Sequence, residues 1–180
     1  MNLSKNTSIY LTSKDSNSRL KKISESEIST DSKRELQSIR LHPNLLRQTI
    51  LGFGGAFTEA SASIYDQLDI NKKSEIIEAY FGKNGNQYNM GRTHINSCDF
   101  SLGNYALCDV EDRELSNFSI ERDKKMLIPF IKAALKKTSV PLHIMASPWS
   151  PPPWMKTNNQ MNHGGKLKEE YQDTWAEYYC

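Results

Sequence analysis

The segment from Pro141 to Asn158, PLHIMASPWSPPPWMKTN, decides the fold class, because an apolar strand runs directly into a stiff aromatic loop. The residues from Leu142 to Ala146 predict a buried strand, and a run of prolines with two tryptophans follows at once. Proline fixes φ and lowers the entropy that a loop loses on ordering, so we expect a rigid loop at the end of this strand.

Two further strands precede this one, with helices between them. TILGFGGAF (49–57) predicts a buried strand that ends in a Gly-rich turn, and YNMGRTHINSCDF (88–100) predicts a second strand with a polar end. Apolar residues at helical spacing predict helices in three places: 64–81, 119–138 and 166–180. This alternation indicates a parallel sheet covered by helices, which fits either a doubly wound sheet or part of a (β/α)8 barrel.

Three residues mark the expected ends or breaks of these helices. Asn71 is expected to cap a second helix within 64–81, and Gly82 is expected to stop it. Pro129 is expected to kink the helix over 119–138 or to open its second part.

Composition and length limit the class of protein. The 180 residues suit about one domain, and 23 basic against 21 acidic residues give no basic face for a nucleic acid. No run approaches the ~18 apolar residues of a membrane span. The polar N-terminus, in which SIYLTS (8–13) predicts one short strand and EISTDSKREL (27–36) a linker or exposed strand, lacks the apolar core of a secretory signal. We therefore expect a cytoplasmic protein.

Cysteine and histidine usage predicts neither a disulfide framework nor a metal centre. Neither CxxC nor HExxH occurs, and the three cysteines are an odd number. We expect no metal and no cofactor.

The segment GFGGAFTEA (52–60) invites comparison with a dinucleotide-binding fingerprint. Gly52 and Gly54 fit it, but Phe57 occupies the position where a small residue allows close helix–strand packing. The alternative is a tight turn that requires glycine, with Glu59 near a helix N-terminus, where its charge is favourable.

The second strand carries two charged candidates. Arg92 lies inside it, and because a buried arginine is costly without an acid, we expect a carboxylate partner in the sheet interior. Asp99 follows its carboxyl end, where parallel sheets place their ligands. Asp99 therefore either hydrogen-bonds a polar ligand or caps a loop.

Trp149 and Trp154 lie in the proline-rich loop after the third strand. Held rigidly, their indole rings offer flat faces for the apolar C–H faces of sugars, with polar neighbours for the hydroxyl groups. The alternative is two core tryptophans beneath a proline-rich corner.

Four motifs in order carry a family resemblance: GFGGAFTEA, YNMGRTHINSCDFS, ASPWSPPPWMKTN and MNHGGKLKEEY. Together they resemble glycoside hydrolase family 30, in particular its glucosylceramidase (acid β-glucosidase) branch. The resemblance covers 48–180 and implies the first three βα units of a (β/α)8 TIM barrel, from its first strand to the start of its third helix. Residues 1–47, with IYLTSKD, resemble a linker and the first strand of a flanking β-sandwich.

The resemblance also implies a chemistry. Such enzymes are retaining β-glucosidases that use two glutamates and no cofactor, on a β-glucoside or glucosylceramide-like substrate. Asp99 would bind sugar hydroxyls, Trp149 would form a wall of the subsite, and Arg92 would support the nucleophile from below. Trp154 and Asn158 are further candidates.

The chain departs from the family pattern at the catalytic glutamates. The family's acid/base lies in an Asn-Glu-Pro motif, which the 180 residues do not contain, and the nucleophile follows later still. We therefore expect no catalytic residue in this chain and no activity of the chain alone. The alternative is a non-catalytic carbohydrate-binding remnant.

Overall fold

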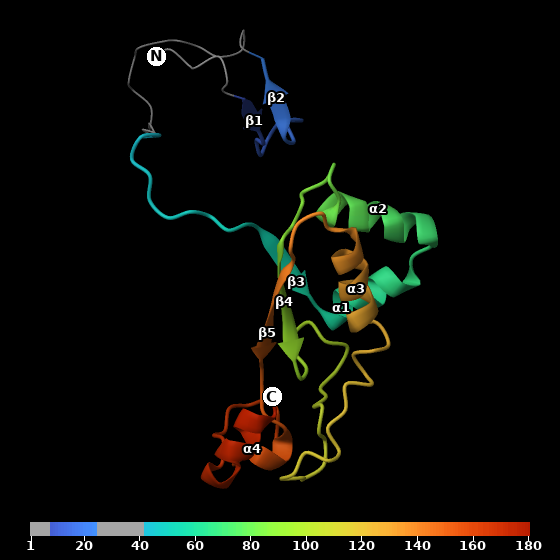
Figure 1. Cartoon of the computed structure of the whole chain (residues 1–180), viewed down its shortest axis with the longest axis vertical. Coiled ribbons are helices and arrows are strands. Elements are labelled where there is room, and N and C mark those ends of the chain that lie inside the picture. The colour runs from blue at the N-terminus through green and yellow to red at the C-terminus, as the bar shows by residue number, and fades with distance from the viewer. Residues whose placement is uncertain (1–7, 25–41) are drawn as a thin grey trace. The chain divides into compact units, whose positions relative to one another are not determined.

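A computed structural model describes residues 8–24 and 42–180 (Figure 1). The chain divides into two compact units, Met1–Gln48 and Thr49–Cys180. The predicted linker or exposed strand over 27–36 lies outside the described residues.

The first unit contains a short antiparallel pair. Strand β1 (Ile9–Leu11) pairs with β2 (Lys21–Ile23), with Tyr10 opposite Lys22. The predicted strand over 8–13 is confirmed. Its partner was not predicted, because Lys-Lys-Ile carries too few apolar residues to indicate a strand by alternation.

The second unit is built on a parallel sheet of order β3-β4-β5. The strands are β3 (Gly54–Phe57), β4 (Met90–Ile95) and β5 (His143–Pro148). Both neighbouring pairs run parallel, as the βα repeat predicts. The carboxyl ends of β4 and β5 therefore lie at the same edge of the sheet.

Helices follow each strand: α1 (Glu59–Gln67), α2 (Ile70–Phe81), α3 (Leu127–Lys137) and α4 (Gln172–Glu177). Two short 3₁₀ helices, η2 (Pro153–Met155) and η3 (Glu169–Tyr171), precede α4. Figure 1 shows α1, α2 and α3 together beside the sheet, where α3 packs on the other two. One apolar core joins them to the sheet: Phe57, Ala62, Ile77, Phe81, Leu127 and Ala134.

Two predicted helix ends differ from the structure. Asp69, rather than Asn71, caps α2, because its carboxylate accepts hydrogen bonds from the second and third amides of the helix. Gly82 ends α2 as predicted. Helix α3 begins at Leu127 rather than at residue 119, and Pro129 lies in its first turn, where a missing N–H costs nothing.

A second apolar core lies around the proline-rich loop. Its buried residues come from the segment after β4, from η2 and from the C-terminal helices: Tyr105, Leu107, Cys108, Trp154, Met155, Tyr171 and Tyr178. This core fixes the loops that follow the strands, where a site is expected.

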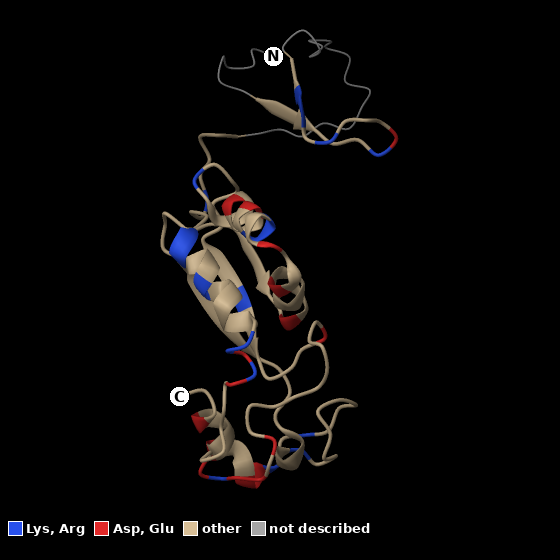
Figure 2. Ribbon diagram, turned by 90° about the vertical axis from the view of Figure 1, so that its right-hand side faces the viewer, with Lys and Arg blue, Asp and Glu red and all other residues tan. Residues whose placement is uncertain are grey.

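Within the described residues, no helix is long and apolar enough to cross a membrane. Among the same residues, no group of three or more His, Cys, Asp or Glu side chains is arranged to hold a metal ion. Figure 2 shows Lys and Arg residues interspersed with Asp and Glu along the described chain.

Candidate functional site

A pocket of about 370 Å³ lies at the carboxyl ends of β4 and β5. Asp99, from the loop after β4, and Trp149, from the loop after β5, both line it. The structure thus brings together the two residues that the sequence singled out. The rest of the lining was not predicted: Ser97, Cys98, Ser101, Gly103, Asn104, Ser150, Met161 and Asn162.

The side chain of Asn96 holds together the segments that surround the pocket. It follows β4 in a left-handed conformation (φ 63°), which asparagine tolerates better than most residues, and its side chain is fully buried. Its Nδ2 donates to the Ser150 carbonyl at 2.9 Å, and its Oδ1 accepts from the Leu107 amide at 2.9 Å and the Tyr178 hydroxyl at 2.7 Å. One amide therefore ties the end of β4 to three other segments of the chain.

The N-terminus of α1 holds the loop that contains Asp99. The Ala60 amide donates to the Phe100 carbonyl at 2.9 Å, and the Leu102 amide donates to Glu59 Oε2 at 2.8 Å. Glu59 is buried and also pairs with Arg122 at 2.8 Å. Glu59 lies at a helix N-terminus, as predicted. Its hydrogen bond with the loop that contains Asp99 gives it a second role.

Arg92 differs from the expectation of a buried residue with an acidic partner. Its side chain is exposed and donates to Ser147 Oγ at 2.9 Å, with the guanidinium 5.8 Å from the centroid of the Trp149 ring. Among residues 8–24 and 42–180, no carboxylate forms an ion pair with it. Arg92 therefore lies over the Trp149 ring and is bonded to Ser147 of the neighbouring strand rather than to an acid.

The two tryptophans of the proline-rich loop have different environments. Trp149 is 37% exposed and faces the pocket. Trp154 is 9% exposed, packs edge-on against Tyr171 with ring centroids 5.0 Å apart, and donates its indole N–H to the Cys108 carbonyl at 3.0 Å. The sugar-face interpretation therefore suits Trp149, whereas Trp154 is the core tryptophan of the alternative.

Asn158 lies beside the pocket rather than in its lining. Its Nδ2 donates to the carbonyls of Asn162 and Gly164 at 3.0 and 3.2 Å. A β-carbon on Gly165 would lie 2.4 Å from Asn158 Oδ1, which explains the glycine there. Asn158 thus orders the turn that supplies Met161 and Asn162 to the pocket.

The lining residues that were not predicted have only weak signals in the sequence. Ser97 and Cys98 stand beside Asp99 in the polar end of the predicted strand, so proximity could have indicated them. Met161 and Asn162 lie in a Gly-rich turn that the bridge between Lys156 and Leu167 helps to close. That closure is a tertiary contact with no local pattern.

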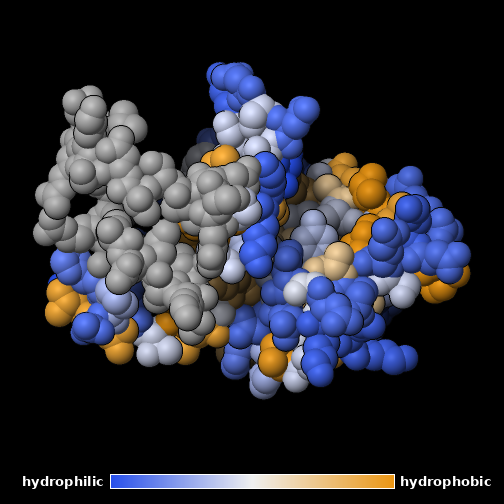
Figure 3. All heavy atoms as spheres, turned by 90° about the horizontal axis from the view of Figure 1, so that it is seen from above, coloured by the Kyte–Doolittle hydropathy of each residue, from blue (hydrophilic) through white to orange (hydrophobic). Residues whose placement is uncertain are grey.

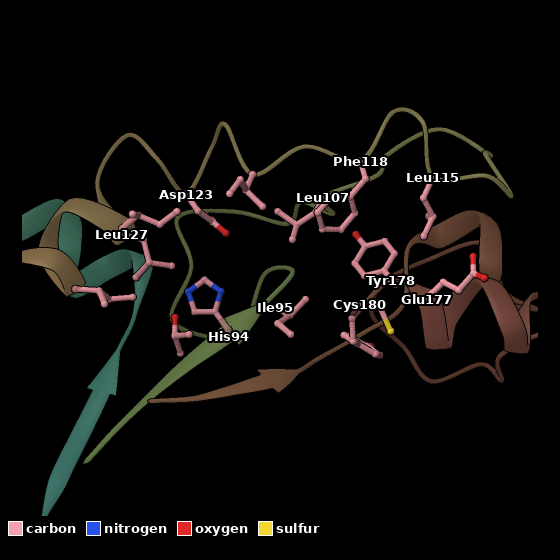
Figure 4. A pocket seen from close by; sticks show the side chains of 15 residues that line it. His94, Ile95, Leu107, Leu115, Phe118, Asp123, Leu127, Glu177, Tyr178 and Cys180 are labelled. Atoms are coloured by element: carbon pink, nitrogen blue, oxygen red, sulfur yellow. The ribbon is translucent and has the colours of Figure 1, made fainter. Parts of the chain in front are cut away.

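A second pocket, of about 530 Å³, lies between β4, α3 and the C-terminal residues. Figure 4 shows the His94 ring and Asp123 toward one end and Tyr178, Glu177 and Cys180 toward the other. Apolar side chains make up most of the lining between them. It has the character of an unfilled space between packed elements rather than of a polar ligand site.

Buried polar groups meet at the His94 end of this second pocket. Asp123 accepts a hydrogen bond from the Tyr105 hydroxyl at 2.8 Å, and burial raises the pKa of the Asp123 carboxyl. Burial also raises the pKa of Tyr105, with the Asp123 hydrogen bond as the next cause. The guanidinium of Arg122 lies 4.2 Å from the centroid of the Tyr105 ring. This network joins α1, β4 and the segment before α3.

The first pocket has groups that suit a ligand, but its lining contains no pair of carboxyl groups. Asp99 is the one carboxylate in its lining, whereas retaining glycoside hydrolysis needs two carboxyl groups ~5–5.5 Å apart. A carboxylate that accepts hydroxyl hydrogen bonds beside a flat indole face suits a sugar. The geometry therefore favours recognition of a polyhydroxylated ligand.

Comparison with known proteins bears on the family of the chain. The sequence model of the glycosyl hydrolase family 30 TIM-barrel domain matches residues 50–180. Putative glucosylceramidase 3 of Caenorhabditis elegans is 44% identical over 137 residues, which cover 73% of this chain and 26% of that protein. Lysosomal acid glucosylceramidase of Mus musculus is 41% identical over 147 residues, covering 78% of this chain and 28% of that protein.

A solved structure gives the same result. The crystal structure of SrfJ from Salmonella typhimurium superposes with a TM-score of 0.70 and 44% sequence identity, covering 73% of this chain and 30% of that one. The chain thus spans less than a third of the length of each of these relatives.

Proposed function

The chain belongs to glycosyl hydrolase family 30, and from this premise we propose that it forms part of the glucose-binding wall of a retaining β-glucosidase of the glucosylceramidase type. The substrate is a β-glucoside or a glucosylceramide-like molecule. Asp99 accepts hydrogen bonds from the sugar hydroxyls, Trp149 stacks on a sugar face, and Arg92 supports the subsite from beneath.

The observation that carries this proposal is the convergence of Asp99 and Trp149 on one pocket. They are 50 positions apart in the sequence, yet both line the space at the carboxyl ends of neighbouring strands. The partial exposure of Trp149, together with the burial of Trp154, leaves a single indole face for the ligand.

We place the catalytic groups outside these 180 residues. Asn-Glu-Pro does not occur in the sequence, and Asp99 is the one acid that lines the pocket. The chain by itself therefore binds a β-glucoside without cleaving it, because a general acid and a nucleophile contribute rate factors that stacking cannot replace.

The test is a titration of the ¹⁵N-labelled chain with methyl β-D-glucoside, followed through the indole N–H signals of its three tryptophans. The Trp149 signal is expected to shift saturably, whereas that of Trp154, already bonded to a carbonyl in the core, stays in place as an internal control. Asp99→Asn is expected to weaken binding roughly tenfold, since hydrogen bonds to a charged group contribute ~1.5–3 kcal/mol.

Two results would contradict the proposal. One is an unchanged Trp149 signal at saturating glucoside while the chain is folded. The other is equal binding by wild type and Asp99→Asn.

The second candidate is a carbohydrate-binding protein without a hydrolytic role. The lining of the first pocket favours it, because Asp99 is the one carboxylate there. Addition of a C-terminal segment from a family relative separates the two. Restored hydrolysis of an aryl β-glucoside supports the enzyme subsite, whereas binding that never leads to hydrolysis supports the second candidate.

A further inference from the structure

Lys156 is a buried lysine that serves no ion pair. Its side chain is 6% exposed, and within the described part of the chain no carboxylate forms a salt bridge with it. Burial lowers the pKa of its ammonium group. A buried charge without a counter-ion is costly, so the position calls for an explanation other than stability.

The ammonium group of Lys156 joins two sides of the sugar pocket. Its Nζ donates to Ser150 Oγ at 3.2 Å and to the Met161 carbonyl at 2.9 Å. Ser150 and Met161 both line the pocket with Trp149, but Lys156 does not. The charge therefore sits behind the wall and bridges its two ends.

The hydrogen-bond directions at Ser150 are fixed by its other partner. The Ser150 hydroxyl donates to the Pro151 carbonyl at 3.0 Å, so its oxygen must accept from Lys156. The Met161 carbonyl is likewise an acceptor. Only a donor in the place of Lys156 satisfies both groups, and an apolar side chain of the same length leaves them unpaired.

The backbone of Lys156 is anchored independently of its side chain. Its amide donates to the Pro153 carbonyl at 3.0 Å at the end of η2, and its carbonyl accepts from the Asn159 amide at 3.1 Å. A β-bridge pairs it with Leu167. Loss of the ammonium group would therefore free the wall of the pocket while leaving the base of the loop in place.

We infer that Lys156 is a positioning residue that holds the two ends of the 149–162 loop together, and so keeps the Trp149 face and the Met161 side of the pocket at the separation that the sugar requires. The inference rests on the proposed sugar-binding function. It assigns a role to a residue that does not touch the ligand.

The experiment compares Lys156→Met with Lys156→Arg and with Lys166→Met, a change of an exposed lysine in the same segment. In titrations with methyl β-D-glucoside, K156M is expected to bind roughly tenfold more weakly, K156R within about threefold of wild type, and K166M like wild type. The midpoint of thermal unfolding of K156M is expected to stay close to that of wild type, because removing a desolvated charge offsets the two lost hydrogen bonds.

A purely structural lysine would behave differently. In that case K156M would lose thermal stability and binding in parallel, and K156R would also be impaired in both. Either that result or unchanged binding by K156M overturns the inference.

Hydrogen exchange separates this inference from the proposed function. Peptides that cover 149–162 are expected to exchange several-fold faster in K156M than in wild type, with or without sugar, and peptides from α2 are expected to be unaffected. Faster exchange in K156M, together with no glucoside binding by wild type, would refute the sugar-binding function and leave the positioning role. Unchanged exchange would refute the positioning role.

Discussion

Glu59 is a single residue that connects the core to the sugar pocket. One carboxylate oxygen accepts from the Leu102 amide beside the pocket, and the other accepts from Arg122. The hydrogen bond that Arg122 donates to Glu59 is the main cause that raises the pKa of Arg122. Because Glu59 is almost fully buried, loss of its side-chain carboxylate would leave these partners without their acceptor.

Glu59→Gln is therefore expected to lower the free energy of unfolding by about 2 kcal/mol. Breaking a fully buried pair costs ~3–5 kcal/mol, and the partial exposure of Arg122 reduces that cost. Urea titration at neutral pH measures the change. Glu75→Gln, which removes an exposed pair with Lys72, is the matched control and is expected to cost under about 0.5 kcal/mol. Equal effects of the two substitutions would contradict the prediction.

Asp123 provides a pH-dependent prediction. Burial raises the pKa of its carboxyl, so the folded chain keeps this proton to a higher pH than the unfolded chain. The carboxyl therefore costs stability as the pH rises from the ordinary aspartate value of about 3.9 through the raised value. Asp123→Asn, which still accepts from Tyr105, removes that cost.

The free energy of unfolding of Asp123→Asn, relative to wild type, is expected to rise with pH across this window and to level off above it. Urea titrations in steps between pH 4 and pH 8 measure the difference. Asp66→Asn, at an exposed position of α1, is the control. A difference that is constant over the whole range would count against a raised pKa.

Individual side chains were the least predictable part of the site. Asp99 and Trp149 could be selected because a strand end places them at the ligand side of a parallel sheet. The sequence could not separate Trp149 from Trp154, because burial of the second depends on Tyr171, which lies beyond a long turn. The exposure of Arg92 depends in the same way on partners elsewhere in the fold.

Among the elements, α2 shows most clearly how local chemistry fixes a helix boundary. The Asp69 carboxylate accepts from the amides of Asn71 and Lys72 at 2.8 and 3.0 Å. Asn71 lies inside the first turn, and its own backbone amide is one of the two that Asp69 caps. Two residues of similar chemistry, two positions apart, thus have different roles.

Asp69→Ala is expected to destabilise the chain by about 1 kcal/mol, the usual cost of losing an N-cap. Asn71→Ala is the matched control and is expected to change stability by less than about 0.5 kcal/mol, since alanine suits a helix interior. Thermal unfolding followed by circular dichroism measures both. A larger loss of stability in Asn71→Ala than in Asp69→Ala would indicate that Asn71 is the cap.

Elements with strong apolar periodicity were predictable, but the start of α3 was not. The apolar period extends over 119–138, yet the first residues of that range form turns. Arg122 and Asp123 are held there by Glu59 and Tyr105, which belong to other segments. These tertiary bonds override the helical tendency until Leu127, from which the chain is free to form α3.

At the scale of the whole molecule, the sheet has two unpaired edges. In the region that the structure describes, no further strand pairs with β3 or with β5 on their outer sides. Large apolar side chains are exposed nearby or on these strands: Leu51, Phe53, Phe100, Leu102 and Met145. Figure 3 likewise shows exposed apolar residues among hydrophilic ones on one face of the chain. Unpaired edges with exposed apolar side chains favour association.

The isolated 180-residue chain is therefore expected to associate and to bind a hydrophobic dye. Sedimentation velocity at micromolar concentration is expected to show species heavier than the 20.6 kDa monomer. Met145→Lys, which places a charge on the edge strand β5, is expected to reduce the heavier fraction by about half or more. Ser74→Lys, on the exposed surface of α2, controls for net charge. A monodisperse wild-type monomer that binds no dye would contradict the prediction.

The architecture of the second unit was predictable where the side chains of its pocket were not. Three short apolar strands with helices between them indicate a parallel sheet without any knowledge of partners. The predicted burial of the first and third strands was wrong, because β3 and β5 are largely exposed in the described chain. The β1–β2 pair was half predicted, because β2 carries two lysines where alternation would need apolar residues. The flanking β-sandwich stays a prediction.

The hydrogen bonds of the Asn96 side chain have a consequence during translation of the protein. Asn96 Oδ1 can accept a hydrogen bond from the Tyr178 hydroxyl only after that residue, 82 positions later in the chain, has been translated. At synthesis rates of roughly 5–20 residues per second, that delay is about 4 to 16 s. During those seconds the nascent chain comes to contain Asp99, Leu107 and then Trp149, so that Asn96 Oδ1 can already accept from the Leu107 amide, but the bond from Tyr178 is still missing. The hydrogen bond from Tyr178 can therefore form only after α4 has been translated, and a chain interrupted between residues 162 and 178 carries all the lining residues of the pocket without that bond.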